Sequence, residues 1–143
     1  MALVEKTVLV PHTAEQMFNL VDRVEEYPQF LPWCGGSQLI ERTPERTVAR
    51  IDIDYRGAKA HFSTANAKEF PHRMVMKLIE GPFRSLDGAW LFKPLGDAAC
   101  KVEFHLQYEF SSRILEKLLG PVFNHIVSTF VESFVKRAQQ IHG

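Results

Sequence analysis

Apolar and polar side chains alternate with a period of two in two stretches of the chain. In residues 47–56, Ala49, Ile51 and Ile53 fall on one face of an extended strand, and charged side chains fall on the other. Residues 101–110 repeat this pattern. A period of two indicates a strand with one buried and one solvent-facing side, as in antiparallel sheets. The pattern therefore predicts an antiparallel sheet.

Five further runs are rich in strand-forming residues. Turn signals such as Thr43-Pro44 and Gly81-Pro82 separate them. The runs lie at residues 3–10, 38–43, 58–68, 73–80 and 85–93. Because no helical pattern interrupts the last six strands, parallel βαβ units are excluded. We expect about seven antiparallel strands.

Two segments have helical spacing. Thr13 lies three residues before Gln16, which is a capping-box spacing, and should start a short helix. The pattern of residues 111–141 predicts one long helix whose apolar positions come in adjacent pairs. Over residues 122–141 the apolar arc covers roughly 220° of the helix surface, about twice the usual stripe. Gly120-Pro121 should kink or break this helix near its start. A helix this apolar must be covered on more than one side.

The segment between the short helix and the second strand should be irregular. Pro28 and Pro32 remove backbone donors, and Gly35-Gly36 loosen the end of the segment. Residues 27–33 nevertheless carry four large apolar side chains. This loop is either tucked under the fold or forms the lip of a cavity.

This order of elements indicates one α+β domain, residues 1–143, in which a curved sheet grips the long C-terminal helix. The space between sheet and helix is the natural place for a ligand. Aromatic residues on inner strand faces are usually core, so the prediction of a ligand site depends on the surplus apolar surface of the helix and the loop. The candidate ligand-binding residues are Phe30, Leu31, Trp33, Phe62, Met76, Phe83, Trp90, Phe104, Phe123, Val127 and Phe130.

Composition narrows the function classes. The 17 Lys and Arg balance the 17 Asp and Glu, and zero net charge argues against a DNA-binding protein that grips phosphates. Two cysteines make no disulfide framework, so reduced thiols in the cytoplasm are expected. No apolar run approaches the roughly 20 residues of a membrane helix, so we expect no membrane span.

Catalytic and metal-binding spacings are missing from the sequence. It contains no Cys-x-x-Cys, His-x-x-x-His or Gly-x-Ser-x-Gly. Asp52 and Asp54 fit better as solvated partners of Arg50 and Arg56 than as an acid/base pair. Cys34 is a candidate reactive thiol, although no His is placed with it. We expect a protein that is not an enzyme, with no catalytic residues, no metal and no required cofactor.

Five strings of the sequence resemble one known family. They lie at residues 10–18, 27–32, 80–84, 88–92 and 102–106. They are similar to the RatA family of bacterial ribosome-association toxins and to the coenzyme Q-binding START-like proteins of mitochondria, which are polyketide cyclase-like (SRPBCC) proteins. The resemblance covers essentially the whole chain and implies the helix-grip fold.

The resemblance implies two functions, and the sequence does not choose between them on its own. The first, which we favour, is binding of a ubiquinone-like prenylated quinone or another prenyl lipid in the cavity, in support of respiration and peripheral to the inner membrane. The second is binding of the 50S ribosomal subunit, which blocks 70S association, with a small antitoxin-like partner. A polyketide cyclase-like enzyme is a third, less favoured reading.

A ribosome-binding surface would need basic residues on the outer face of the sheet. Candidates on strands and turns are Arg42, Arg46, Arg50, Arg56, Lys59, Arg73, Lys77 and Arg84. Since Asp52 and Asp54 share that face, a mixed solubilising surface is at least as well supported.

Overall fold

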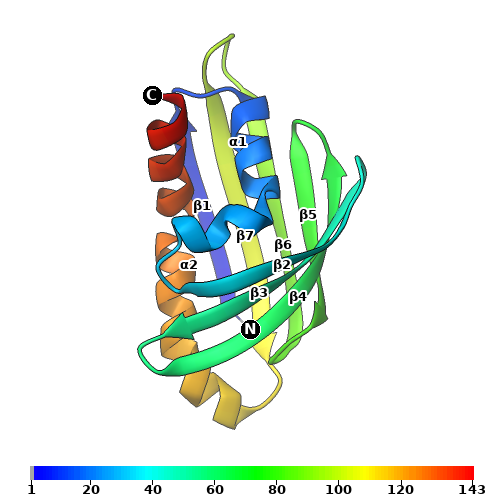
Figure 1. Cartoon of the computed structure of the whole chain (residues 1–143), viewed down its shortest axis with the longest axis vertical. Helices are drawn as coiled ribbons and strands as arrows, with labels where there is room; N and C mark the ends of the chain where they lie inside the picture. The colour runs from blue at the N-terminus through cyan, green and yellow to red at the C-terminus, as the bar shows by residue number, and fades with distance from the viewer. Residues whose placement is uncertain (1) are drawn as a thin grey trace.

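A computed structural model describes residues 2–143, within which seven strands form a single antiparallel sheet (Figure 1). The strand order is β1-β7-β6-β5-β4-β3-β2. The strands are β1 (Ala2–Val10), β2 (Cys34–Arg42), β3 (Arg46–Tyr55), β4 (Ala58–Glu69), β5 (Arg73–Glu80), β6 (Phe83–Pro94) and β7 (Cys100–Phe110). The helices are α1 (Ala14–Asp22), the 3₁₀ helix η1 (Val24–Gln29) and α2 (Arg113–His142).

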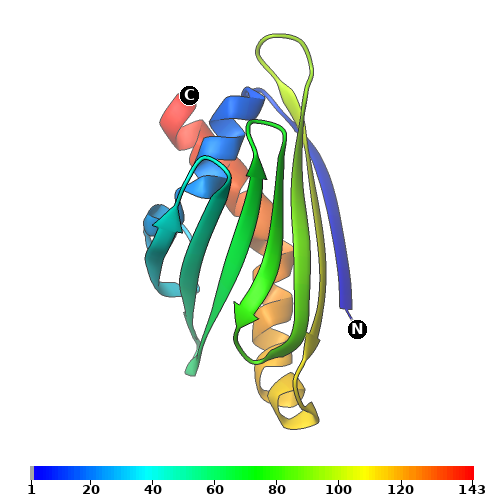
Figure 2. The same cartoon turned by 90° about the vertical axis from the view of Figure 1, so that its right-hand side faces the viewer.

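The sheet curves around α2 (Figures 1 and 2). Helix α1 packs against α2 and β6, and η1 packs against β2. The predicted strand faces are confirmed, since Ala49, Ile51 and Ile53 are buried while Asp54 is exposed. The predicted α+β helix-grip architecture is therefore the observed one.

Helix α1 starts as the sequence predicts. The Thr13 side chain accepts a hydrogen bond from Gln16 N at 3.1 Å, and Gln16 Oε1 accepts one from Thr13 N at 2.9 Å, so both halves of the capping box are present. Its inward face buries Met17 and Phe18 in the core. The segment directly after α1, within the stretch expected to be irregular, forms the 3₁₀ helix η1.

Helix α2 continues through Gly120 and Pro121, so the predicted break is wrong. A proline removes one hydrogen bond from the helix, and the burial of Phe123, Ile126 and Phe134 just beyond it stabilises the helix on its far side. The first turns lie at an angle to the rest of the helix (Figure 1). Pro121 thus lies inside α2 and does not end it.

The apolar arc of α2 is only partly covered. Phe123, Ile126 and Val127 are buried against the sheet, whereas Ile114 and Leu118 near the N-terminal end of the helix are 70% and 65% exposed. By length and composition alone this helix also passes as a candidate membrane span, a test that the core helix of a folded domain passes as well, so the absence of a membrane span stays a prediction. In the structure this segment is the central helix of the domain, and one of its faces is buried in the core.

Strand β2 begins at Cys34, four residues earlier than predicted, and includes Gly35 and Gly36. The irregularity expected there is a bulge in the pairing of β2 with β3. A Cβ on Gly35 would lie 2.8 Å from Asp54 Cβ, and one on Gly36 would lie 3.0 Å from Asp52 Oδ2. The two glycines let the strands approach, and they do not loosen the end of a loop.

Candidate functional site

A mostly apolar cavity lies between the concave face of the sheet and α2. It offers about 70 Å³ to the centres of water-sized molecules. Its walls come from η1, the residue before β2, strands β3 to β7 and helix α2. The lining residues are Val24, Tyr27, Trp33, Ala49, Ile51, Phe62, Thr64, Asn66, Met76, Leu86, Phe104, Leu106, Phe123, Ile126, Val127 and Phe130.

Many of the candidate residues lie in this wall. They are Trp33, Phe62, Met76, Phe104, Phe123, Val127 and Phe130. Phe62, Met76 and Phe130 are only half-buried, whereas Phe104 and Phe123 are fully buried. The wall therefore combines fully buried side chains with others that are partly accessible.

Four candidate residues do not line the cavity, and here the prediction needs correction. Phe30 packs on Tyr27 and Phe134, with the Arg137 guanidinium over its ring. Leu31 is 1% exposed and belongs to the core.

The other two lie next to the lining residues. Trp90 is also core, packed on Phe104 and Phe130 from behind the wall. Phe83 stacks on Phe110 and contacts Phe123. Inner-face position alone does not show which side chains reach the open space, because depth depends on how the sheet curves.

Sequence reasoning missed the polar part of the wall. Thr64 and Asn66 are buried on the inner face of β4, and the Thr64 hydroxyl donates a 2.9 Å hydrogen bond to Asn66 Oδ1. Thr64 and Asn66 lie two and four residues after Phe62 and so share its inner face of the strand. Two polar residues on that face were the signal that could have revealed the polar part of the wall. The indole Nε1 of Trp33 is buried and has no hydrogen-bond partner within residues 2–143.

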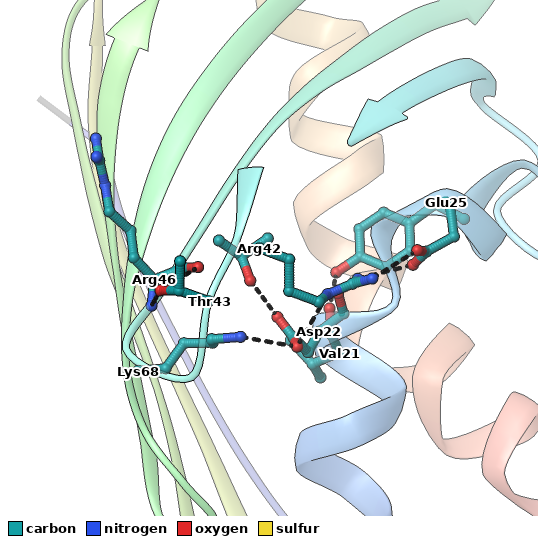
Figure 3. Close-up of polar contacts among 9 residues, drawn as sticks. Val21, Asp22, Glu25, Arg42, Thr43, Arg46 and Lys68 are labelled. Carbon is teal, nitrogen blue, oxygen red and sulfur yellow. Dashed lines mark hydrogen bonds and ion pairs between the residues drawn. The ribbon is translucent and has the colours of Figure 1, made fainter. Parts of the chain in front are cut away.

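A polar cluster holds η1 against the sheet beside this cavity (Figure 3). Asp22, at the end of α1, accepts hydrogen bonds from Thr47 Oγ1 at 2.7 Å and Lys68 Nζ at 3.1 Å. Arg42 binds both carboxylate oxygens of Glu25 at 2.7 and 2.8 Å. The Arg42 hydrogen bonds lower the pKa of Glu25, and those of Glu25 raise the pKa of Arg42.

The same region fixes Tyr27, whose hydroxyl donates to the Val21 carbonyl. Burial raises the pKa of Tyr27 far above its usual range, with the Asp22 carboxylate adding to the effect. Tyr27 therefore stays neutral. Its ring lines the cavity, and its hydroxyl keeps the hydrogen bond to the backbone of α1.

The side chains considered for catalysis make contacts with neighbouring protein groups. Asp52 pairs with Arg50 at 2.9 Å, as expected, while Arg56 lies over the Tyr55 ring, 5.2 Å from its centroid. Cys34 is buried and its Sγ donates to the Gly36 carbonyl at 3.2 Å. Burial raises the pKa of this thiol to about 11, so it is protonated at neutral pH. Residues 2–143 contain no group of three or more metal-binding side chains close enough to hold an ion.

Most of the candidate basic residues are neutralised locally. Acidic partners lie within 4.0 Å of Arg42, Arg46, Arg50, Arg73 and Arg84. Arg56, Lys59 and Lys77 form no ion pair among the described residues. The outer face is therefore the mixed surface that the sequence also allowed.

A curved antiparallel sheet wrapped around one long C-terminal helix defines a START-like helix-grip protein. The profile of the family described as "Polyketide cyclase / dehydrase and lipid transport" matches residues 10–135, and the chain belongs to this family.

Within the family, the chain is similar to proteins named ribosome association toxin RatA. The Escherichia coli K12 protein is 40% identical over 143 residues, covering 100% of this chain and 90% of the relative. The Vibrio cholerae protein is 43% identical, covering 100% and 99%. The Xenopus laevis mitochondrial coenzyme Q-binding protein COQ10 homolog B is 26% identical, covering 90% of this chain and 54% of that protein. The resemblance carried by the sequence strings is confirmed.

Solved structures support the fold. A START superfamily protein from Mycobacterium smegmatis has a TM-score of 0.76 and 24% identity, covering 97% of this chain and 98% of that one. The Zhui aromatase/cyclase from Streptomyces sp. R1128 has a TM-score of 0.79 and 14% identity, covering 97% and 94%. A START superfamily protein and an aromatase/cyclase thus share this architecture, and at such identities the likeness concerns the fold alone.

Proposed function

We propose that this protein binds a ubiquinone-like prenylated quinone in the cavity between the sheet and α2, and that it does so without catalysing a reaction. The observation that carries the proposal is the cavity itself. Its wall is mostly apolar, includes the polar pair Thr64 and Asn66, and contains the half-buried Phe62, Met76 and Phe130. The similarity to a protein named coenzyme Q-binding supports the ligand class.

The size of the cavity indicates how the ligand enters. About 70 Å³ is too little for a whole quinone, since ligand pockets usually measure about 300–1,000 Å³. Rotation of the half-buried Phe62, Met76 and Phe130 would enlarge it. Each methylene transferred from water contributes about 0.8 kcal/mol, so a few isoprene units provide a substantial free energy of binding.

Native mass spectrometry of protein purified from its own host, followed by titration with a short-tailed ubiquinone, tests the proposal. Phe123→Ala removes wall contacts and Ala49→Leu fills the cavity, so each should weaken quinone binding by about tenfold. Phe110→Ala is the matched control, because Phe110 is buried but does not line the cavity. Absence of both co-purified lipid and quinone binding contradicts the proposal, as does unchanged binding in both wall variants.

The proposal includes a place of action. Prenylated quinones reside in membranes, so a cytoplasmic carrier would meet them peripherally at the inner membrane. Cell fractionation should recover most of the protein in the cytosolic fraction. A smaller part should be found on membranes and should be released from them by salt or carbonate. Recovery only with detergent-extracted integral proteins contradicts this location.

Association with the 50S ribosomal subunit, with a small antitoxin-like partner, is the second candidate function. The observation that favours it is 40–43% identity over the full chain to proteins named ribosome association toxin. Since most outer-face cations are paired, contact with RNA would depend on a local group such as Arg56, Lys59 and Lys77.

Sucrose-gradient sedimentation with purified subunits separates the two functions. Ribosome association predicts co-migration with 50S particles, loss of binding as salt rises, and weaker binding for the Lys59→Glu/Lys77→Glu double variant. Lys6→Glu on β1, at the far edge of the sheet, is the control. Wild-type protein that stays at the top of the gradient contradicts this function.

A further inference from the structure

The cavity wall contains hydrogen-bond donors that its apolar character does not explain. Trp33 is 2% exposed and lines the cavity, yet its Nε1 has no partner within residues 2–143. Asn66 is 5% exposed and lines the same cavity. Buried polar groups are nearly always hydrogen-bonded, so the unpaired indole N–H is an exception in this wall that a bound molecule or an ordered water would satisfy.

The Asn66 amide is oriented by its neighbour. Thr64 and Asn66 are two residues apart on β4 and share a face, and the Thr64 hydroxyl donates to Asn66 Oδ1 at 2.9 Å. This hydrogen bond occupies the carbonyl side of the amide and leaves the two Nδ2 hydrogens for another partner. Asn66 is therefore held as a donor toward the cavity.

Trp33 is fixed by the backbone around it. The Asp54 N–H donates to the Trp33 carbonyl at 2.9 Å, and the Cys34 N–H donates to Leu31 O at 3.0 Å. Its ring packs on Phe130, with centroids 6.2 Å apart. A donor held in this way needs little ordering when a ligand arrives.

Building on the proposed quinone-binding function, we propose that Trp33 Nε1 and Asn66 Nδ2 donate hydrogen bonds to carbonyl oxygens on the head of the ligand. These two side chains would then determine specificity within the cavity. An indole N–H can only donate, so the ligand atom facing it must be an acceptor. A ligand of the same shape without oxygens would leave both donors buried and unpaired, and sites built around such donors discriminate strongly against it.

The indole resonances provide a test that needs no variant. In ¹H–¹⁵N spectra, a benzoquinone carrying two isoprene units should shift the Trp33 Nε1–H signal downfield. The matched benzene with the same tail should not. Trp90, which is buried but does not line the cavity, supplies an internal reference. A Trp33 signal that does not respond to bound quinone overturns the inference.

Binding measurements with the same two probes give an independent test. Wild-type protein should bind the quinone at least tenfold more tightly than the hydrocarbon. Trp33→Phe and Asn66→Leu should each reduce quinone affinity about tenfold and change hydrocarbon affinity much less, because each removes donors and leaves an apolar side chain in the wall. Phe123→Ala should weaken both probes alike.

These outcomes separate the two levels of the proposal. If wild-type protein binds neither probe, the proposed quinone-binding function fails. If it binds both probes equally, and Trp33→Phe and Asn66→Leu leave both affinities unchanged, the cavity binds ligands but the assignment of these donors is overturned. Thermal unfolding of each variant verifies that a loss of binding is not a loss of fold.

Discussion

Lys68 Nζ lies 3.1 Å from Asp22 Oδ2, and the two side chains are only 5% and 13% exposed. The pair joins β4 to the end of α1, directly before η1, which supplies Val24 and Tyr27 to the cavity wall. A nearly buried ion pair is sensitive to the loss of either partner, because the remaining charge is left without compensation. Asp22 thereby ties the position of one cavity wall to the sheet.

Replacing Asp22 with Asn should consequently destabilise the domain. The change leaves the Lys68 ammonium buried without an anionic partner, and we expect a loss of about 2–4 kcal/mol in the free energy of unfolding. Urea denaturation at pH 7 measures it. Asp52→Asn is the control, since Asp52 pairs with Arg50 on a surface where both side chains are about 40% exposed, and should cost less than about 1 kcal/mol. Equal losses in the two variants would contradict the assignment of Asp22.

The strands could be predicted from the sequence wherever side chains carry the pattern. Ala49, Ile51 and Ile53 alternate with charged residues and lie on the buried face as expected. The start of β2 was missed because Gly35 and Gly36 have no side chain to show a period, and their role is the close approach to β3. Glycine in a strand and glycine in a loop look the same in one sequence.

The sequence could predict which strand face the candidate site lies on, but not which residues of that face line the cavity. Phe104 and Trp90 both point inward from neighbouring strands, yet only Phe104 reaches the cavity. Which inner-face residues reach open space depends on the curvature of the sheet and the position of α2, which a pattern of alternation does not contain. Thr64 and Asn66 were missed because polar residues on a strand suggest the outer face.

Replacing Gly120 with Ala should stabilise the protein. Gly120 lies inside α2, and a Cβ placed there meets no atom within 4 Å outside its immediate neighbours and the helix's own nearby backbone. Glycine costs a helix interior about 0.5–1 kcal/mol relative to alanine, but the Cδ of Pro121 crowds the Cβ of a helical residue before it, so the unfolding free energy should rise by less than that amount. Chemical denaturation measures the change.

Gly88→Ala provides the opposite case. A Cβ there would lie 2.7 Å from Met76 Cε and 3.1 Å from the His105 carbonyl oxygen, so this variant should be less stable than wild type. If Gly120→Ala is also destabilising, the helix turn that contains Pro121 requires a glycine before the proline.

Both cysteines should react slowly in the folded protein. Burial raises the pKa of Cys34 and of Cys100 to about 11, so little thiolate is present at pH 8. Labelling with a thiol-specific disulfide reagent should be slow in buffer and should reach two thiols per chain in urea. Labelling of Cys34 at the rate of a free thiol would contradict its placement.

The same shifts give a dependence on alkaline pH. A thiol whose pKa is higher in the folded state stabilises that state as long as both states stay protonated. This contribution is complete below about pH 9, the ordinary thiol value, and is lost as the pH rises through about 11. Unfolding free energies measured between pH 8 and 10 should therefore decline, and replacing both cysteines with alanine should reduce the decline.

His12 should make the protein sensitive to mild acid. The side chain is 3% exposed, its Nε2 has no partner within residues 2–143, and its ring lies 5.9 Å from that of His142. Burial lowers the pKa of His12 below 6.5, and the charge on His142 lowers it further. Because the folded state disfavours the charged imidazole, the stability of the folded state is complete above about pH 6.5 and falls as the pH drops below that value.

Melting temperatures recorded between pH 7.5 and 5.0 at constant ionic strength should fall less steeply for His12→Phe than for wild type. His61→Gln, a change at an exposed residue, should keep the wild-type slope. A His12→Phe slope equal to that of wild type would assign the acid sensitivity to other groups.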